Sequence, residues 1–186
     1  AVLLVLAAWR DDLLISSDKG VTSAEVLSAG RLRSAVTYVT PDGVTHNPIL
    51  ALDAQVWPSM ALPGAAEKFA SAITTAEQRM SVGEGFSYGE DRDGVWTEGT
   101  GQMALLMKLL GRTGRANSLI AVIESQRSPD GGFYATTVRE LPTGFVLDTD
   151  PTKPRLYFRL SHLGAASWAA LAERGFNPFT VTKGLP

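Results

Sequence analysis

One stretch near the middle of the chain, residues 97–112, limits the possible folds more than any other. It begins with Thr97, Glu98 and two glycines, and it continues as an apolar run in which Lys108 is the only charge before Arg112. A helix that has no polar face is stable only when protein surrounds it. We therefore expect residues 97–112 to form a buried helix at the centre of a helical arrangement.

The next segment, residues 115–126, has a different pattern. Apolar side chains recur at helical spacing at Ala116, Leu119 and Ile123, and polar residues such as Asn117 lie on the opposite face. This pattern is typical of an amphipathic helix that covers a core. The two segments together predict a hairpin of one buried and one covering helix.

The same alternation recurs along the chain. We expect buried helices over residues 1–15, 49–62, 97–112 and 160–173, and covering helices over residues 22–39, 65–80 and 115–126. Pro58 fits poorly inside a helix, so the second buried helix should start near Trp57 or be kinked there. The longest connection, 127–159, contains a Thr/Val stretch that could pair as a short hairpin.

Repeated antiparallel hairpins predict an all-α fold, an α/α toroid or a partial toroid. Because the buried helices would run in one direction, most of the long connections would collect on one rim, where binding and catalysis usually occur. The 186 residues, 45% of them hydrophobic, suffice for one domain over residues 1–186. That domain is either complete or a fragment of a larger toroid.

Composition excludes several classes of function. The net charge of −2, without a run of Lys or Arg, argues against a nucleic-acid surface, and the absence of cysteine excludes disulfides and thiolate metal sites. The apolar run 1–8 is too short to span a bilayer. It is either part of a buried helix or the remnant of a signal sequence, so the location stays open, with an extracytoplasmic one favoured. We expect no cofactor.

The expected rim brings carboxylates and aromatic rings together. Glu98 would lie between Trp96 and an apolar helix, where desolvation raises a carboxyl pKa, and Asp53 begins the neighbouring buried helix. Two such carboxylates suit glycoside hydrolysis, and aromatic rings suit sugar faces. Asp91 and Asp93 are the reserve for the second carboxylate. The candidates for substrate binding are Trp57, Trp96, Tyr88, Gln102, Asp91, Asp93, Phe133, Tyr134, Tyr157, Arg159 and His162.

Structural alternatives compete with each assignment. Glu98, Thr97 and Asp53 are all suitable helix caps, and the tryptophans are suitable core residues. The sequence Asp91-Arg92-Asp93-Gly94 is only distantly similar to a calcium loop and lacks the ligand spacing of an EF-hand, so we expect no metal site. His162 would hydrogen-bond either a substrate or the backbone.

Three segments carry a family resemblance: Trp96-Thr97-Glu98-Gly99-Thr100-Gly101-Gln102, Leu52-Asp53-Ala54-Gln55-Val56-Trp57, and 162–168 followed by Asn177-Pro178-Phe179. They resemble segments of six-hairpin, (α/α)6 toroid glycosidases and related carbohydrate-active proteins. The resemblance implies a glycosidase with Glu98 as the acid. This chain has only about three and a half hairpins, so further hairpins or a partner chain would complete the toroid, or the protein is a reduced relative.

A second resemblance is carried by Gln126-Arg127-Ser128-Pro129-Asp130-Gly131-Gly132-Phe133, which is similar to a repeat of triterpene cyclases. Those cyclases are also α/α toroids, but the aspartate run that would protonate an alkene is missing here. The sequence therefore predicts a carbohydrate-active protein, most simply a glycoside hydrolase-like enzyme. The alternatives are a non-catalytic sugar-binding or scaffolding domain and a terpenoid cyclase-like protein.

Overall fold

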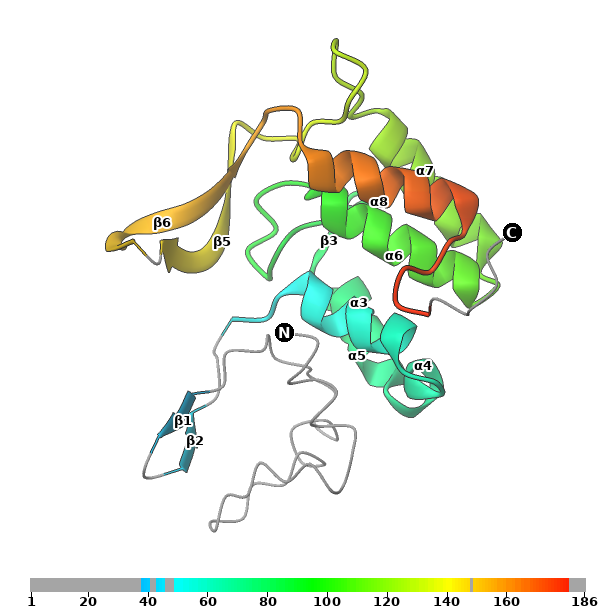
Figure 1. The fold of residues 1–186 in the computed structure, drawn as a ribbon, viewed down its shortest axis with the longest axis horizontal. Helices are drawn as coiled ribbons and strands as arrows, with labels where there is room; N and C mark the ends of the chain where they lie inside the picture. The colour runs from blue at the N-terminus through cyan, green and yellow to red at the C-terminus, as the bar shows by residue number, and fades with distance from the viewer. Residues whose placement is uncertain (1–37, 41–42, 46–48, 148, 181–186) are drawn as a thin grey trace.

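The structure is a computed structural model that describes residues 38–40, 43–45, 49–147 and 149–180. Within these residues six helices follow one another (Figure 1). They are α3 (Leu52–Ala61), α4 (Ala65–Lys68), α5 (Ala70–Arg79), α6 (Thr97–Leu109), α7 (Thr113–Glu124) and α8 (Leu163–Arg174). The helices predicted over 97–112, 115–126 and 160–173 are therefore confirmed, with ends that differ by a few residues.

Strands accompany the helices as three antiparallel pairs in the described residues. The pairs are β1 (Tyr38–Thr40) with β2 (Gly43–Thr45), β3 (Ser81–Val82) with β4 (Gly85–Phe86), and β5 (Glu140–Leu147) with β6 (Asp150–Phe158). The all-α toroid predicted from the hairpins is therefore wrong, because the chain has a mixed arrangement of helices and small sheets.

The β5–β6 hairpin accounts for much of this difference. It replaces most of the expected rim loop and extends from the helices as a twisted arm (Figure 1). Its sequence combines β-branched and aromatic residues with Pro142 and Pro154, which disfavour a helix interior. The Thr/Val stretch at 136–138 is not part of this hairpin, because Thr136 forms an isolated bridge with Trp96. The hairpin pairs later residues, from Glu140 opposite Phe158 to Leu147 opposite Asp150.

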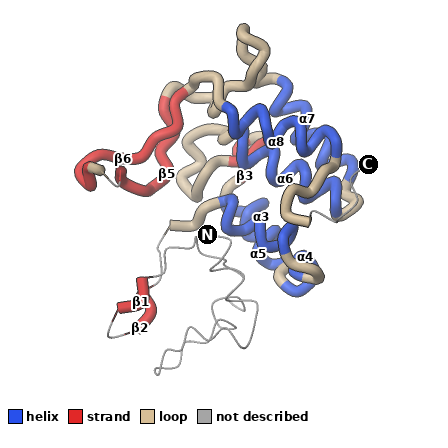
Figure 2. The backbone as a smooth tube through the Cα atoms, viewed as in Figure 1, coloured by secondary structure: helices blue, strands red, loops and turns tan. Residues whose placement is uncertain are grey.

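Helix α6 is the centre of the packing, as its apolar sequence predicts. It packs against α7 on one side and against α8 and α3 on others (Figure 2). Residues 99–107 of α6 are all buried. Gly101 allows α8 to approach closely, because a Cβ atom at this position would lie 3.0 Å from the Trp168 Cβ.

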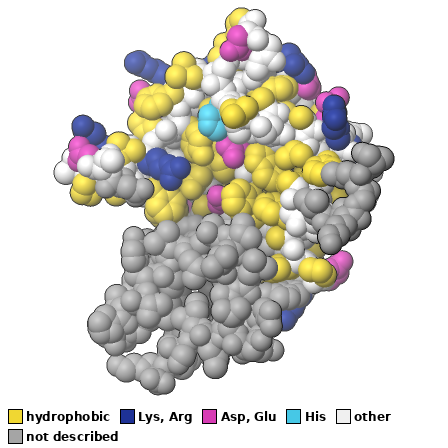
Figure 3. Space-filling view, in the orientation of Figure 1, with side chains coloured by type: hydrophobic (Ala, Val, Ile, Leu, Met, Phe, Trp, Pro, Cys, Tyr) yellow, Lys and Arg dark blue, Asp and Glu magenta, His cyan; other side chains and the backbone are white. Residues whose placement is uncertain are grey.

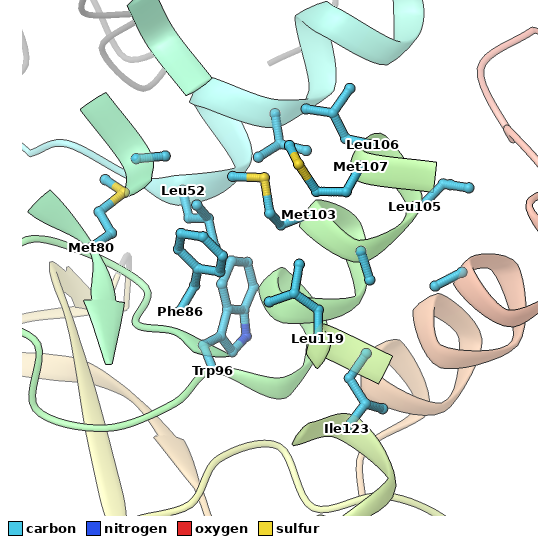
Figure 4. Packing of buried hydrophobic residues seen from close by; sticks show 14 of the residues in the cluster. Leu52, Met80, Phe86, Trp96, Met103, Leu105, Leu106, Met107, Leu119 and Ile123 are labelled. Carbon is cyan, nitrogen blue, oxygen red and sulfur yellow. The ribbon is translucent and has the colours of Figure 1, made fainter. Parts of the chain in front are cut away.

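The main hydrophobic core forms around the N-terminal half of α6. Leu52 from α3, Phe86 from β4 and Trp96 lie next to Met103, and Leu119 of α7 closes the opposite side (Figure 4). Each of these side chains is at most 2% exposed. Burial of one such side chain contributes about 1.5–3 kcal/mol, so this cluster holds α3, α6 and α7 together.

Three other expectations have mixed outcomes. Helix α3 starts at Leu52 and continues through Pro58, so a start near Trp57 is wrong. The covering segment 65–80 is divided between α4 and α5 at Phe69, which has a non-helical backbone. The segments 1–15 and 22–37 lie outside the described residues, whereas Tyr38–Thr40 belongs to a strand. Within the described part of the chain, every helix is too short or too polar to span a membrane.

Candidate functional site

The N-terminal ends of α3 and α6 meet where Leu52 lies on Gly99. A Cβ atom on Gly99 would be 2.8 Å from the Leu52 Cδ2 and 2.6 Å from the Trp96 Cζ3, so only glycine allows this approach. The backbone N–H of Leu52 also donates to the Tyr88 carbonyl over 2.9 Å. As a result Asp53 and Glu98, the residues next to this contact, have interacting charges.

Both carboxyl groups are partly withdrawn from water. Burial raises the pKa of Glu98, and the charge of Asp53 raises it further, whereas a hydrogen bond from the Trp168 side chain lowers it. Burial also raises the pKa of Asp53, against the lowering effects of the Ala54 N–H, 2.7 Å from Oδ1, and of the Arg155 charge. Asp53 therefore has more groups that favour its ionised form than Glu98 has.

Three aromatic rings adjoin the carboxyl pair. The ring centroid of Trp96 lies 4.9 Å from that of Tyr88 and 5.5 Å from that of Tyr157, and the two tyrosines are 6.1 Å apart. Burial raises the pKa of Tyr157 to about 12, with the charge of Glu98 as the next cause. Both Asp53 and Glu98 also raise the pKa of Tyr88, after its burial. The tyrosines are thus neutral and close to the carboxylates.

The first turn of α8 forms the other side of the site. The His162 Nδ1 lies 3.6 Å from the Glu98 Oε2. At Gly164 an added Cβ would lie 2.8 Å from the Glu98 Cδ and closer still to its Oε2. The missing side chain of Gly164 is therefore what gives Glu98 its room.

Gln102 of α6 and Trp57 of α3 each lie one helical turn beyond a carboxylate of the pair. Gln102 follows Glu98 by one helical turn, is fully buried, and has no hydrogen-bond partner for either side-chain amide atom among the described residues. Trp57 follows Asp53 by one turn and stacks on Trp168, with a centroid distance of 6.3 Å and an interplanar angle of 23°. Phe179 contacts both of these rings.

Five of the candidate residues lie elsewhere. Asp91 and Asp93 are exposed on a turn in which the Arg92 Nε donates to the Arg79 carbonyl. Phe133, Tyr134 and Arg159 belong to a neighbouring cluster with Gln126 and Arg127, and the Phe133 carbonyl accepts the His162 N–H. There Arg127 lies over the ring of Phe133, and Arg159 lies over Tyr134 while donating to Gln126.

The alternative that the carboxylates are simple helix caps finds little support. Trp96 is the N-cap residue of α6 and Ala51 that of α3, and neither helix has a side-chain cap hydrogen bond. The core alternative holds for Trp96, which is 2% exposed. His162 does bond the backbone, because it caps α8 by accepting from the Ala165 N–H.

Arg155, Gly164 and Trp168 were absent from the predicted site. Arg155 acts on Asp53 from β6, and it precedes Tyr157 by two residues, so both lie on one face of the strand. That alternation is a signal in the sequence, but it requires knowing that residues 150–158 form a strand. Nothing in the sequence marks Gly164 as the neighbour of Glu98.

The surface around the site is largely apolar. Hydrophobic side chains gather over α3, α6 and α8, and acidic side chains interrupt them (Figure 3). In the part of the chain that the structure describes, no three His, Asp or Glu side chains come together as they would around a metal ion. Comparison with known proteins gives no match to a family model, to a curated protein or to a solved structure.

Proposed function

We propose that this protein is a carbohydrate-active enzyme that hydrolyses a glycosidic bond, with Glu98 as the proton donor and Asp53 as the second carboxylate. The observation that carries the proposal is the position of two partly buried carboxyl groups at the adjoining N-terminal ends of α3 and α6, beside an aromatic cluster. Glycoside hydrolysis requires one neutral and one ionised carboxyl group. Pairs of titratable groups whose surroundings separate their pKa values suit such a division.

The surroundings support this division of roles. Arg155 and the Ala54 N–H stabilise the ionised form of Asp53. Glu98 has only the Trp168 hydrogen bond to favour ionisation, and it experiences the Asp53 charge. The Asp53 charge therefore favours the neutral form of Glu98, which is the form that a general acid needs.

The residues around the pair are suited to bind a sugar. Tyr88, Tyr157 and Trp57 combine ring faces with polar edges, as carbohydrate ligands require. The buried amide of Gln102 costs about 1–3 kcal/mol while it lacks a partner, and a ligand hydroxyl that reached it would recover part of that cost.

Kinetics with leaving groups of different basicity would test the proposal. We expect the unaltered protein to hydrolyse members of a panel of aryl glycosides and oligosaccharides. Glu98→Gln should lower kcat by about 10²- to 10⁴-fold for a poor leaving group. The loss should shrink for a dinitrophenyl glycoside, because that leaving group needs no proton. Asp53→Asn should reduce hydrolysis of both.

Gly164→Ala supplies an independent geometric test. Its Cβ would force the Glu98 carboxyl group to move, so hydrolysis should fall while the fold persists. Gly114→Ala in α7 is the matched control, since no atom lies within 4 Å of its added Cβ. Sugar binding without turnover by the unaltered protein would instead indicate a non-catalytic sugar-binding domain, and failure to bind or hydrolyse any sugar would reject the proposal.

A further inference from the structure

His162 has two roles that meet at a single atom. Its Nδ1 accepts the N–H of Ala165 over 3.3 Å and so caps α8, and the same Nδ1 lies 3.6 Å from the Glu98 Oε2. The imidazole ring also makes a T-shaped contact with the Tyr157 ring, with a centroid distance of 5.6 Å and an interplanar angle of 89°. The helix cap and the aromatic contact therefore both fix the position of this imidazole beside Glu98.

The cap determines which nitrogen carries the proton. A nitrogen that accepts a hydrogen bond cannot carry a hydrogen of its own, so neutral His162 has its hydrogen on Nε2. Its Nδ1 lone pair is then close to an oxygen of Glu98. Two acceptors in this position disfavour the ionised carboxylate, whereas the neutral acid can direct its hydrogen to Nδ1, whose one lone pair would then accept from both the Ala165 N–H and Glu98.

We propose that His162 is a positioning residue that keeps Glu98 in the neutral acid form, with its hydrogen directed toward Nδ1 when no substrate is bound. A neutral Glu98 carries the proton that the proposed hydrolysis requires, so the catalytic role of His162 rests on that proposed function. At 3.6 Å the contact is longer than a hydrogen bond, but catalytic hydrogen bonds are often long without substrate and tighten in the complex.

The other groups around the pair act on Glu98 independently of His162. Asp53 of α3 raises the pKa of Glu98, and the Trp168 side chain of α8 lowers it. Tyr157 of β6 is neutral, and Arg155 of the same strand acts on Asp53 and on the tyrosines. Burial lowers the pKa of His162 itself, which keeps its ring neutral. Substitution of His162 alone should therefore isolate its own effect.

Two substitutions separate the cap from the contact with Glu98. His162→Ser retains a good N-cap residue, but the serine side chain is too short to reach Glu98. His162→Asn is also a good cap, and its Oδ1 is bonded to Cγ as the histidine Nδ1 is, so it restores an acceptor without a titratable ring. Both variants should fold, which circular dichroism and thermal unfolding would verify.

The experiment measures the ionisation of Glu98 as a function of pH, by NMR of 13C-labelled glutamate carboxyl groups. The Glu98→Gln variant assigns the Glu98 signal. His162→Ser should lower the pKa of Glu98 by about 1 unit, a tenfold change in the ionisation constant. His162→Asn should restore the pKa of Glu98 to its value in the unaltered protein. The alkaline limb of the pH profile of kcat/KM should shift in parallel with this pKa.

An unchanged Glu98 titration in His162→Ser would overturn the inference, as would a His162→Asn variant that behaves like the serine variant. Because the NMR titration needs no turnover, it separates the two proposals. The predicted titrations in a protein that hydrolyses no glycoside would leave the Glu98–His162 inference standing and reject the proposed function. Hydrolysis that depends on Glu98 but not on His162 would do the reverse.

Discussion

At Asp130 the carboxylate accepts hydrogen bonds from Ser128, Ser161 and the Gly132 N–H, and these bonds hold its pKa down at about 2 although the side chain is exposed. At Asp53 and Glu98 the main influence is burial, which raises the pKa of both groups. The two regions thus treat a carboxyl group in opposite ways. One stabilises the charge by direct hydrogen bonds, and the other withdraws it from water.

The difference shows which acidic residue suits which task. Asp130 organises a turn in which the Ser128 N–H donates to the Gly132 carbonyl, and a permanently ionised carboxylate serves that purpose. Proton transfer near neutral pH needs a group that holds its proton more tightly, and desolvation supplies it. Asp130 and Glu98 are both acidic and each precedes a glycine, so their surroundings in the fold rather than their sequence neighbours decide their protonation.

The largest difference between the two regions should appear in kcat, when an aspartate in each region is replaced by asparagine. Asp53→Asn should lower kcat by about 10²-fold or more, because it removes one of the two carboxyl groups that the reaction needs. Asp130→Asn should leave kcat within about twofold. Steady-state kinetics on one glycoside would measure both, and a comparable loss from Asp130→Asn would place the reaction outside the proposed site.

The two regions should also differ in how much stability is lost when a glycine is replaced by alanine. Gly99→Ala would place a Cβ against Trp96 and Leu52, and such overpacking typically costs about 1–3 kcal/mol or more of the free energy of unfolding. Gly132→Ala near Asp130 meets its nearest atoms at 3.3 Å and should cost much less. Denaturant unfolding would compare them, with Gly114→Ala as a control that should be neutral or stabilising. Equal losses from Gly99→Ala and Gly114→Ala would contradict the close approach of α3 to α6.

The buried carboxyl of Asp53 should reduce stability at neutral pH. Its pKa is higher in the folded state than in the unfolded chain, so ionisation favours unfolding at a pH above both values, and this cost disappears below about pH 4. Asp53→Asn should therefore raise the Tm at pH 7 and have little effect at pH 3. Thermal unfolding at the two pH values would check this, and a lower Tm at pH 7 would show that the charge stabilises the fold.

The smallest effect, of opposite sign, is expected at Asp130. Its pKa is lower in the folded state, at about 2, than the roughly 3.9 of an unfolded chain, so the ionised group stabilises the fold at pH values above about 4. That contribution is lost as the pH falls toward 2. Asp130→Asn should slightly lower the Tm at pH 7 and leave it unchanged near pH 2. Thermal unfolding at pH 7 and pH 2 would measure this difference in Tm. A higher Tm for Asp130→Asn at pH 7 would contradict the stabilising role of the ionised Asp130.

Part of the site could be anticipated from helical spacing. Glu98 begins an apolar helix and Asp53 begins another, and both are partly buried as their positions suggest. Tyr88, Tyr157 and His162 also lie at this site. Phe133, Tyr134 and Arg159 instead lie in a neighbouring cluster, because the expected rim does not determine which loop side chains contact one another. The fold class was wrong for a related reason, since residues 127–159 were treated mainly as a loop.

Local pattern by itself determined the helices around the core. The period of apolar residues is a property of neighbours in sequence, so it identified α6 as buried and α7 as its amphipathic cover. Only the tertiary structure decided that Leu52 would rest on Gly99, that Gly164 would leave room for Glu98, and that Arg155 would act on Asp53. These contacts join residues far apart in the chain, and desolvation and charge depend on distance in space rather than on position in sequence.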